Sequence, residues 1–358
     1  MHSQLSRSRK RRPPSSGLVL SSGERMSTPL LQARGLTKVF RLKSGLFAKA
    51  SNQVAVDSVD LDLAKRERIG MVGESGSGKS TLGRLLLGLT PPTVGEVRFE
   101  GVPHKERTSR DWSKFRMQTS LVQQNPLSAL NPQMTIGEQV AEAVWVHHVA
   151  DRAGARDRAA AMLERVGLPT GMMGRFPHQM SGGQRQRVVI ARALVLGPKL
   201  VVFDEAVSAL DVSVQAQVVS ILRSLWQELD LAYVFITHDL RIVRHLVDRI
   251  AVMYLGRVVE TGDIRSVYAW PRHPYTRALL ASVPTMDPRV RNVEPPIQGE
   301  LDFSTLAKGC SFRSRCPFAI DRCVSETPAL RQAGDQKVAC HRAEELPREI
   351  VPQREIAQ

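Results

Sequence analysis

The fold of this chain is decided by one segment, Gly73-Glu74-Ser75-Gly76-Ser77-Gly78-Lys79-Ser80. It fits the pattern G-x-x-x-x-G-K-[ST], in which a glycine-rich loop joins a strand to a helix. The apolar run at 69–72 predicts the strand, and leucines at helical spacing after the loop predict the helix. A glycine-rich turn with a chance lysine would lack this context. The leucines expected to face a sheet are Leu82, Leu85, Leu86 and Leu89.

The same loop has the chemistry that holds nucleotide phosphates. Its glycines allow backbone N–H groups to surround a phosphate, and the helix that follows presents its positive end there. Lys79 adds a charge between the β and γ oxygens, and Ser80 is suited to ligate Mg²⁺. The predicted nucleotide-binding residues are Gly73, Glu74, Ser75, Gly76, Ser77, Gly78, Lys79, Ser80, Thr81 and, from a later strand, Asp204.

Two carboxylates follow the apolar run at 200–203, which predicts another buried strand. Phosphoryl transfer needs a carboxylate that holds the metal and a group that activates water. We expect Asp204 to reach Mg²⁺ from the strand tip through water, and Glu205 to be the general base. The alternative is that both acids cap the next helix.

Short apolar runs alternate with helical segments along the chain. This alternation predicts an α/β fold with a parallel sheet covered by helices. We expect a third buried strand at 233–236 and a long amphipathic helix at 214–225. Residues 126–185 break the alternation with a mostly helical pattern, which predicts an inserted helical subdomain.

Composition divides the chain of 358 residues into three parts. We expect a basic disordered leader at 1–28, a nucleotide-binding domain at 29–262 and a loop-rich extension at 263–358 that holds all four cysteines. Lys and Arg exceed Asp and Glu by 50 to 35, which raises nucleic acid, anionic lipid or anionic ligands as partners. No uncharged apolar stretch reaches the roughly 18 residues that cross a bilayer.

A second glycine-containing helix start is predicted at Ser181-Gly182-Gly183-Gln184. A helix N-terminus with glycines is suited to bind a phosphate, although the first loop already binds the phosphates of one nucleotide. Together the two segments resemble those of the ATP-binding cassette (ABC) ATPases, which are P-loop NTPases. The resemblance implies a pair of cassettes in which the signature of one subunit, here Ser181 to Gln184, closes over ATP held by its partner.

Further motifs of that family occur in the expected order. The resemblance implies that Gln124 is the Q-loop residue that touches Mg²⁺, and that His238 is the switch histidine at the γ-phosphate. It places Asp211, in Ser208-Ala209-Leu210-Asp211, at the dimer seam. Phe40 occupies the place of the aromatic that stacks on adenine, but it could equally pack in the first sheet. The implied catalytic residues are Glu205, His238 and Gln124, and the implied Mg²⁺ ligands are Ser80, Gln124 and Asp204.

One position departs from the family pattern. Ala206 stands where these ATPases usually have proline. We expect this change to tune the turn after Glu205 without removing activity, because both acids remain.

Two other segments, 125–132 and 273–277, resemble the oligopeptide/dipeptide importer branch. The resemblance implies an ATPase that energises uptake of di- or oligopeptides, with ATP and Mg²⁺ as cofactors. The implied partners are a second ABC subunit, two transmembrane permeases and, indirectly, an external peptide-binding protein. The implied location is the cytoplasmic face of a bacterial inner membrane, with no nucleic acid bound. The alternative is a soluble ABC ATPase that acts on nucleic acid or ribosomes.

The four cysteines follow the spacing Cys310-x5-Cys316-x6-Cys323-x16-Cys340. They could supply four thiolates to an iron–sulfur cluster or a zinc ion, although close C-x2-C pairs are absent. Resemblance to the importer branch favours a [4Fe–4S] cluster. The alternative is four reduced structural thiols.

Overall fold

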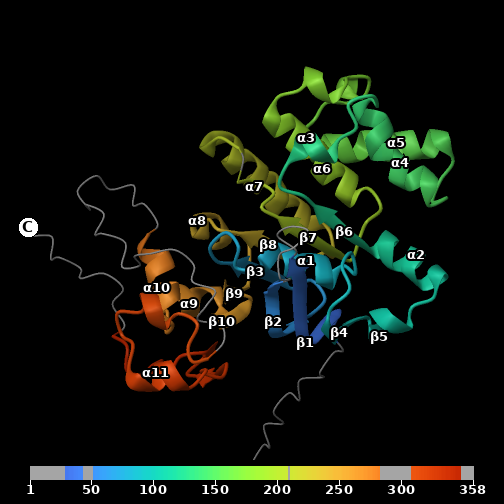
Figure 1. Ribbon diagram of the computed structural model, residues 1–358. Helices are drawn as coiled ribbons and strands as arrows, with labels where there is room; N and C mark the ends of the chain where they lie inside the picture. The colour runs from blue at the N-terminus through green and yellow to red at the C-terminus, as the bar shows by residue number, and fades with distance from the viewer. Residues whose placement is uncertain (1–28, 43–50, 209, 283–307, 348–358) are drawn as a thin grey trace, which may run out of the picture.

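The computed structural model describes residues 29–42, 51–208, 210–282 and 308–347. The predicted leader at 1–28 and Ala209 lie outside the described residues, as do 283–307 and 348–358 of the predicted extension. Figure 1 shows two sheets in the middle of the molecule, helices α3 to α6 above them and the C-terminal elements to one side.

The smaller sheet is antiparallel and was not anticipated from the sequence. Its strand order is β2-β1-β4-β5. Strand β1 pairs with both β2 and β4, and register shifts along β1 interrupt both ladders. The strands are β1 (Leu31–Leu42), β2 (Ser51–Leu63), β4 (Val94–Phe99) and β5 (Val102–Pro103).

The larger sheet has the order β11-β12-β10-β9-β3-β8-β7-β6. Strands β9, β3, β8, β7 and β6 are parallel, as predicted, and β10, β12 and β11 add antiparallel pairs. The strands are β3 (Arg68–Val72), β6 (Thr119–Val122), β7 (Leu200–Asp204), β8 (Ala232–Thr237), β9 (Arg249–Tyr254), β10 (Arg257–Asp263), β11 (Arg331–Ala333) and β12 (Gln336–Val338).

Both faces of this larger sheet are buried. Along β7, Val201 and Phe203 belong to one hydrophobic cluster, and Leu200 and Val202 to another. Successive side chains of a strand point to opposite faces, so a strand covered on both sides reads as a continuous apolar run. This is why the three central strands could be recognised from the sequence.

Helix α1 (Lys79–Leu86) follows the glycine-rich loop. Leu82, Leu85 and Leu86 are fully buried, as predicted, but Leu89 is 60% exposed and its prediction was wrong. The helix ends at Leu86, and Gly88 turns the chain with a φ of +64°. The helical spacing therefore no longer applies at residue 89.

The helical block lies beyond the carboxyl end of the sheet and is drawn in green in Figure 1. Helices α4 and α5 pack on each other and on α6, whose other contacts reach β6 and α7. The block consists of α3 (Pro126–Ala129), α4 (Ile136–Val146), α5 (Arg152–Arg165) and α6 (Gly182–Leu194). The remaining helices of the first 262 residues are α2 (Ser109–Gln118), α7 (Val212–Glu228) and α8 (Leu240–Val243), with 3₁₀ turns at His104–Glu106, Thr170–Met172 and Pro177–Gln179.

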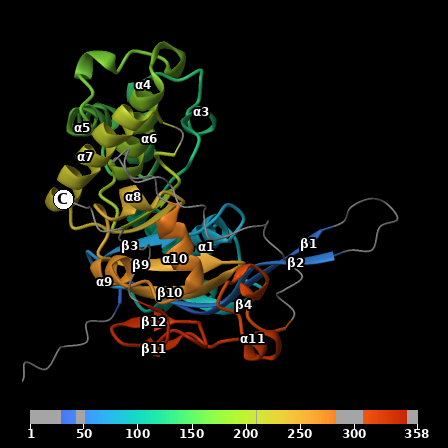
Figure 2. The same ribbon diagram turned by 90° about the vertical axis from the view of Figure 1, so that its left-hand side faces the viewer.

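The C-terminal part has more regular structure than the predicted loop-rich extension. Strand β12 pairs with β10, matching Glu260 with Val338, and so adds a hairpin to the edge of the sheet, as Figure 2 shows. The helices here are α9 (Ile264–Ala269), α10 (Pro274–Ala281) and α11 (Asp321–Ser325), with a 3₁₀ turn at Arg313–Arg315.

No helix within the described ranges combines the length and apolar character needed to cross a membrane.

Candidate functional site

The phosphate loop lies between β3 and α1, at the carboxyl edge of the parallel strands. Gly73 and Gly78 have φ values of +152° and +100°. A Cβ at Gly78 would lie 2.1 Å from the carbonyl oxygen of Ala55, and one at Gly73 would lie 2.2 Å from that of Met253. Both positions therefore require glycine. Ser75 and Gly76 form an exposed tip at which a phosphate can approach backbone N–H groups.

Lys79 is buried among oxygens of its own loop. Its Nζ donates to the carbonyl oxygens of Gly73 and Glu74, each at 2.8 Å, and to Ser77 Oγ at 3.2 Å. Burial lowers the pKa of Lys79, and the nearby carboxylates Glu205, Asp204 and Glu74 oppose this shift. A phosphate oxygen can replace a loop carbonyl as the partner of this ammonium group.

The two acids after β7 point to different partners. Asp204 Oδ1 accepts a hydrogen bond from Ser80 Oγ at 2.6 Å. Burial raises the pKa of Asp204, and the Ser80 hydrogen bond opposes the shift. A hydroxyl and a carboxylate oxygen are ligands that Mg²⁺ prefers, so Ser80 and Asp204 fit the predicted metal role.

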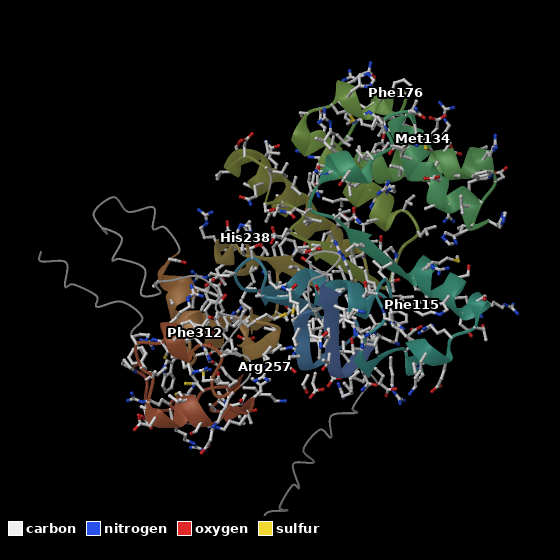
Figure 3. The ribbon with its side chains drawn as sticks, viewed as in Figure 1. Phe115, Met134, Phe176, His238, Arg257 and Phe312 are labelled. Atoms are coloured by element: carbon white, nitrogen blue, oxygen red, sulfur yellow. The ribbon has the colours of Figure 1, made fainter. Side chains whose placement is uncertain are left out.

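Glu205 joins two of the other predicted catalytic residues. Its Oε2 accepts from Gln124 Nε2 at 3.0 Å, and its Oε1 lies 3.4 Å from His238 Nδ1. Figure 3 labels His238 at the edge of the strands. Glu205 has a φ of +50°, in the left-handed region that residues other than glycine seldom adopt. The side-chain partners of both acids are therefore residues that the sequence predicted for the same site. Neither acid is the helix cap considered as an alternative, since the N-cap of α7 is Asp211.

The signature segment lies at the start of α6, in the helical block. Ser181 and Gln184 form a capping box: Gln184 N donates to Ser181 Oγ at 3.3 Å, and Ser181 N donates to Gln184 Oε1 at 3.0 Å. A Cβ at Gly183 would lie 2.3 Å from Val214 Cγ1, so α6 and α7 approach closely here. Gly182 and Asp211 are exposed.

The remaining predicted contact is Phe40 in β1. Its side chain is 39% exposed, and Lys38 Nζ lies 5.2 Å from the ring centroid. The ring is therefore outside the core that was considered as its alternative position. Thr81 lies in the first turn of α1 and is partly buried.

Two residues of the C-terminal part touch the phosphate loop and were missed by sequence reasoning. Tyr275 Oη accepts a hydrogen bond from Glu74 N at 2.8 Å, and Arg315 Nη1 lies 3.1 Å from Glu74 Oε2. Tyr275 belongs to the segment 273–277, which resembles the importer branch, but no local signal in the sequence links it to a loop 201 positions away.

The four cysteines gather in one region as free thiols. Cys310 N donates to the carbonyl oxygen of Cys323 at 2.8 Å. Burial, followed by the neighbouring thiols, raises the pKa of Cys316 to about 11 and that of Cys340 to about 12. In the described ranges, no three His, Cys, Asp or Glu side chains form a group that could hold a metal ion. The geometry thus gives no support to the predicted iron–sulfur cluster or zinc ion.

Comparisons with known proteins agree with this architecture. A family model described as "ABC transporter" matches residues 56–208, and one described as "Oligopeptide/dipeptide transporter, C-terminal region" matches residues 259–323. The dipeptide transport ATP-binding protein DppF of Haemophilus influenzae is 44% identical over 316 residues, covering 88% of this chain and 97% of the relative. The chain belongs to the ABC transporter family, in its oligopeptide/dipeptide branch.

Further relatives extend this result. The di/tripeptide transport ATP-binding protein DppF of Pseudomonas aeruginosa is 42% identical over 88% of this ABC subunit and 98% of the relative. The solved cassette MJ0796, a dimer in a post-hydrolysis state with ADP and Pi, has a TM-score of 0.59 at 27% identity, covering 66% of this chain and 99% of that one. The cbiO1 protein from Clostridium perfringens also has a TM-score of 0.59, at 26% identity, covering 68% of this chain and 92% of that one. This ABC subunit is an ATPase coupled to transport.

Proposed function

We propose that this ABC subunit hydrolyses ATP to drive the import of di- or oligopeptides through a membrane permease pair. The observation that carries the proposal is the junction at the strand ends, where Glu205 contacts both Gln124 and His238 and its neighbour Asp204 contacts Ser80. The relatives named above as dipeptide and di/tripeptide transport proteins support peptides as the cargo. The transport names of these relatives do not favour the nucleic-acid alternative.

Each side chain has a distinct task in this proposal. Lys79 and the N–H groups of the loop bind the phosphates, and Phe40 stacks on the base. Bound Mg²⁺ supplies charge neutralisation on the phosphates. Glu205 accepts a proton from the attacking water. His238 would contact the γ-phosphate, and Ser80, Gln124 and Asp204 would hold the Mg²⁺ ion.

Exposed features outside this site support the proposed partners. Ser181 to Gln184 would meet ATP held by a second ABC subunit, and the exposed Asp211 would lie at the seam between them. On the helical block, Leu127, Trp145 and Val146 are exposed large apolar side chains, which supports contact with a permease. In this arrangement the subunit lies against the cytoplasmic face of the membrane, and no peptide touches it.

The chain divides accordingly into two functional parts. The cassette would comprise residues 29–262 with the helical subdomain at about 126–185, and the importer-type extension would comprise 263–358. A metal at the four cysteines is a separate proposal, which rests on their spacing in the sequence and not on the geometry of the described residues. Iron, acid-labile sulfide and zinc measured on anaerobically purified protein test it, and their absence refutes it.

The general-base role is tested with Glu205→Gln in the assembled transporter. The variant keeps MgATP binding and loses hydrolysis by about 10²- to 10⁴-fold, because the amide cannot accept the proton. Glu228→Gln, on the exposed end of α7, is the control and keeps the parental rate. Parental hydrolysis by Glu205→Gln would refute the proposed mechanism.

A further inference from the structure

The C-terminal part of the chain contacts the phosphate loop at one residue, Glu74. Tyr275, on α10, accepts a hydrogen bond from the Glu74 N–H at 2.8 Å. Arg315, between two of the cysteines, lies with Nη1 3.1 Å from Glu74 Oε2. Both residues lie outside the segment 56–208 that matches the ABC transporter family. The loop is therefore held from outside the core of the cassette.

These two contacts come from a packed aromatic cluster. Tyr275 and Phe312 are fully buried, and their ring centroids lie 5.5 Å apart. Tyr254, at the end of β9, lies 4.7 Å from Tyr275 and 5.2 Å from Phe312 by the same measure. Figure 3 labels Phe312 on the C-terminal side of the molecule. Packing on all sides fixes the direction of the Tyr275 hydroxyl.

The side chain of Arg315 is buried and contacts both Tyr254 and Glu74. Its side chain is 8% exposed, and Nη1 also lies 3.4 Å from Tyr254 Oη. Burial lowers the pKa of Arg315, but hydrogen bonds to Tyr254 and Glu74 outweigh it and leave that pKa raised. A buried guanidinium needs an anionic partner, and Glu74 supplies it.

The peptide unit between Gly73 and Glu74 is the one that Tyr275 fixes. Its N–H, on Glu74, donates to Tyr275, and its carbonyl, on Gly73, accepts from Lys79 Nζ at 2.8 Å. The next carbonyl, on Glu74, accepts from Lys79 at the same distance. The orientation of this peptide therefore determines where the phosphate-binding lysine lies.

We propose that Tyr275 and Arg315 are positioning residues of the ATP site, which hold the start of the phosphate loop through Glu74. The C-terminal part then completes the nucleotide site of its own chain. This inference rests on the proposed function and adds two residues to it. The loop binds the phosphates of the ground state and the transition state alike, so loss of either contact weakens nucleotide binding and leaves the chemical step intact.

The test uses Tyr275→Phe and Arg315→Met in the full-length chain. Each variant raises the Kd for ADP about three- to tenfold, the amount expected for one lost hydrogen bond. In the assembled transporter each raises the KM for MgATP by a similar factor and leaves kcat within about twofold. Arg315→Lys, which keeps the charge, recovers part of the loss.

Matched controls separate this effect from a general loss of packing. Tyr268→Phe, on α9 and away from the loop, removes a hydroxyl that donates to the carbonyl oxygen of Leu240. Arg322→Ala breaks an exposed pair with Glu326 in the same C-terminal part. Both controls keep the parental Kd and KM. Arg315→Met adds no further loss to Glu74→Gln, because the pair is already broken in that background.

Two outcomes decide the matter. If Tyr275→Phe and Arg315→Met unfold at a lower temperature without nucleotide and still bind ADP with the parental Kd, both residues are merely structural and the proposal fails. Failure of the proposed hydrolytic mechanism would look different, because Glu205→Gln would then hydrolyse ATP at the parental rate. The Kd for ADP tests the positioning role of Tyr275 and Arg315 whether or not Glu205 is the general base.

Discussion

At the residue scale, the site depends on positions where no other side chain fits. Gly78 combines a φ of +100° with a distance of 2.1 Å between the Cβ that a larger residue would carry and the carbonyl oxygen of Ala55. A larger residue here would carry both the strain of a positive φ and a collision of its Cβ with the backbone. A backbone carbonyl cannot rotate away as a side chain can. The sequence motif predicted this requirement, because glycine at position 78 is one of the residues that define the motif.

Gly78→Ala is therefore expected to lose MgATP binding and to lower the free energy of unfolding by more than about 1 kcal/mol. Gly101→Ala is the matched control, since Gly101 has a φ of +81° and no atom within 4 Å of the added carbon. It carries strain without collision and keeps full nucleotide affinity. Chemical denaturation and nucleotide titration of both variants check the prediction. Equal affinities in the two variants would contradict it.

At the element scale, the sequence predicted strands and helices where one local pattern decided them. Buried strands such as β7 and β8 are continuous apolar runs, and α1 begins where the loop motif ends. Leu89 was misplaced because the end of α1 depends on a turn at Gly88. Strands β11 and β12 have three residues each. Strand β12 is placed by its pairing with β10, and β11 by its pairing with β12, and no local signal in the sequence reveals either pairing.

Helix α6 begins with a capping box formed by Ser181 and Gln184, and Ser181 is also predicted to face the ATP of the partner subunit. Ser181→Ala is expected to lower the free energy of unfolding by about 1 kcal/mol and to reduce ATP hydrolysis by the assembled transporter. The added hydrolysis loss arises because the hydroxyl would also face the partner's nucleotide.

Thr135→Ala is the control for that change, because Thr135 caps α4 with the same kind of box through Glu138. It lowers stability to a similar extent and leaves hydrolysis at the parental rate. Denaturation and ATPase assays on both variants distinguish a cap from a site residue. If hydrolysis falls equally in both, the signature role of Ser181 is wrong.

At the scale of the whole molecule, the C-terminal part is joined to the cassette through buried polar groups. Glu260, on β10, is fully buried and accepts hydrogen bonds from the N–H groups of Arg272 at 2.6 Å and His273 at 3.1 Å. His273 Nδ1 in turn accepts from Tyr275 N at 3.1 Å. The sequence could not predict this junction or the contact at Glu74, because the residues involved come from separate segments and meet only after folding.

Two titrations at this junction oppose each other. Burial raises the pKa of Glu260 from 4.5 to about 7, so the folded state holds a proton that the unfolded chain releases, and stability falls as pH rises through that window. Burial lowers the pKa of His273 from 6.5 to about 3. Between these values the unfolded chain binds a proton that the folded state does not bind, so the free energy of unfolding falls as pH drops through this window. Where the windows overlap, the two slopes cancel.

Glu260→Gln removes the contribution of Glu260 to the pH dependence of stability and leaves that of His273. The free energy of unfolding of the variant, relative to the parent, is expected to rise between about pH 4.5 and 6.5 by up to about 3 kcal/mol, because the histidine then acts alone. Urea denaturation at several pH values measures this difference. Glu345→Gln, at an exposed pair with Arg342, is the control and changes the pH profile little. A variant profile parallel to that of the parent would show that Glu260 is already ionised in the folded state.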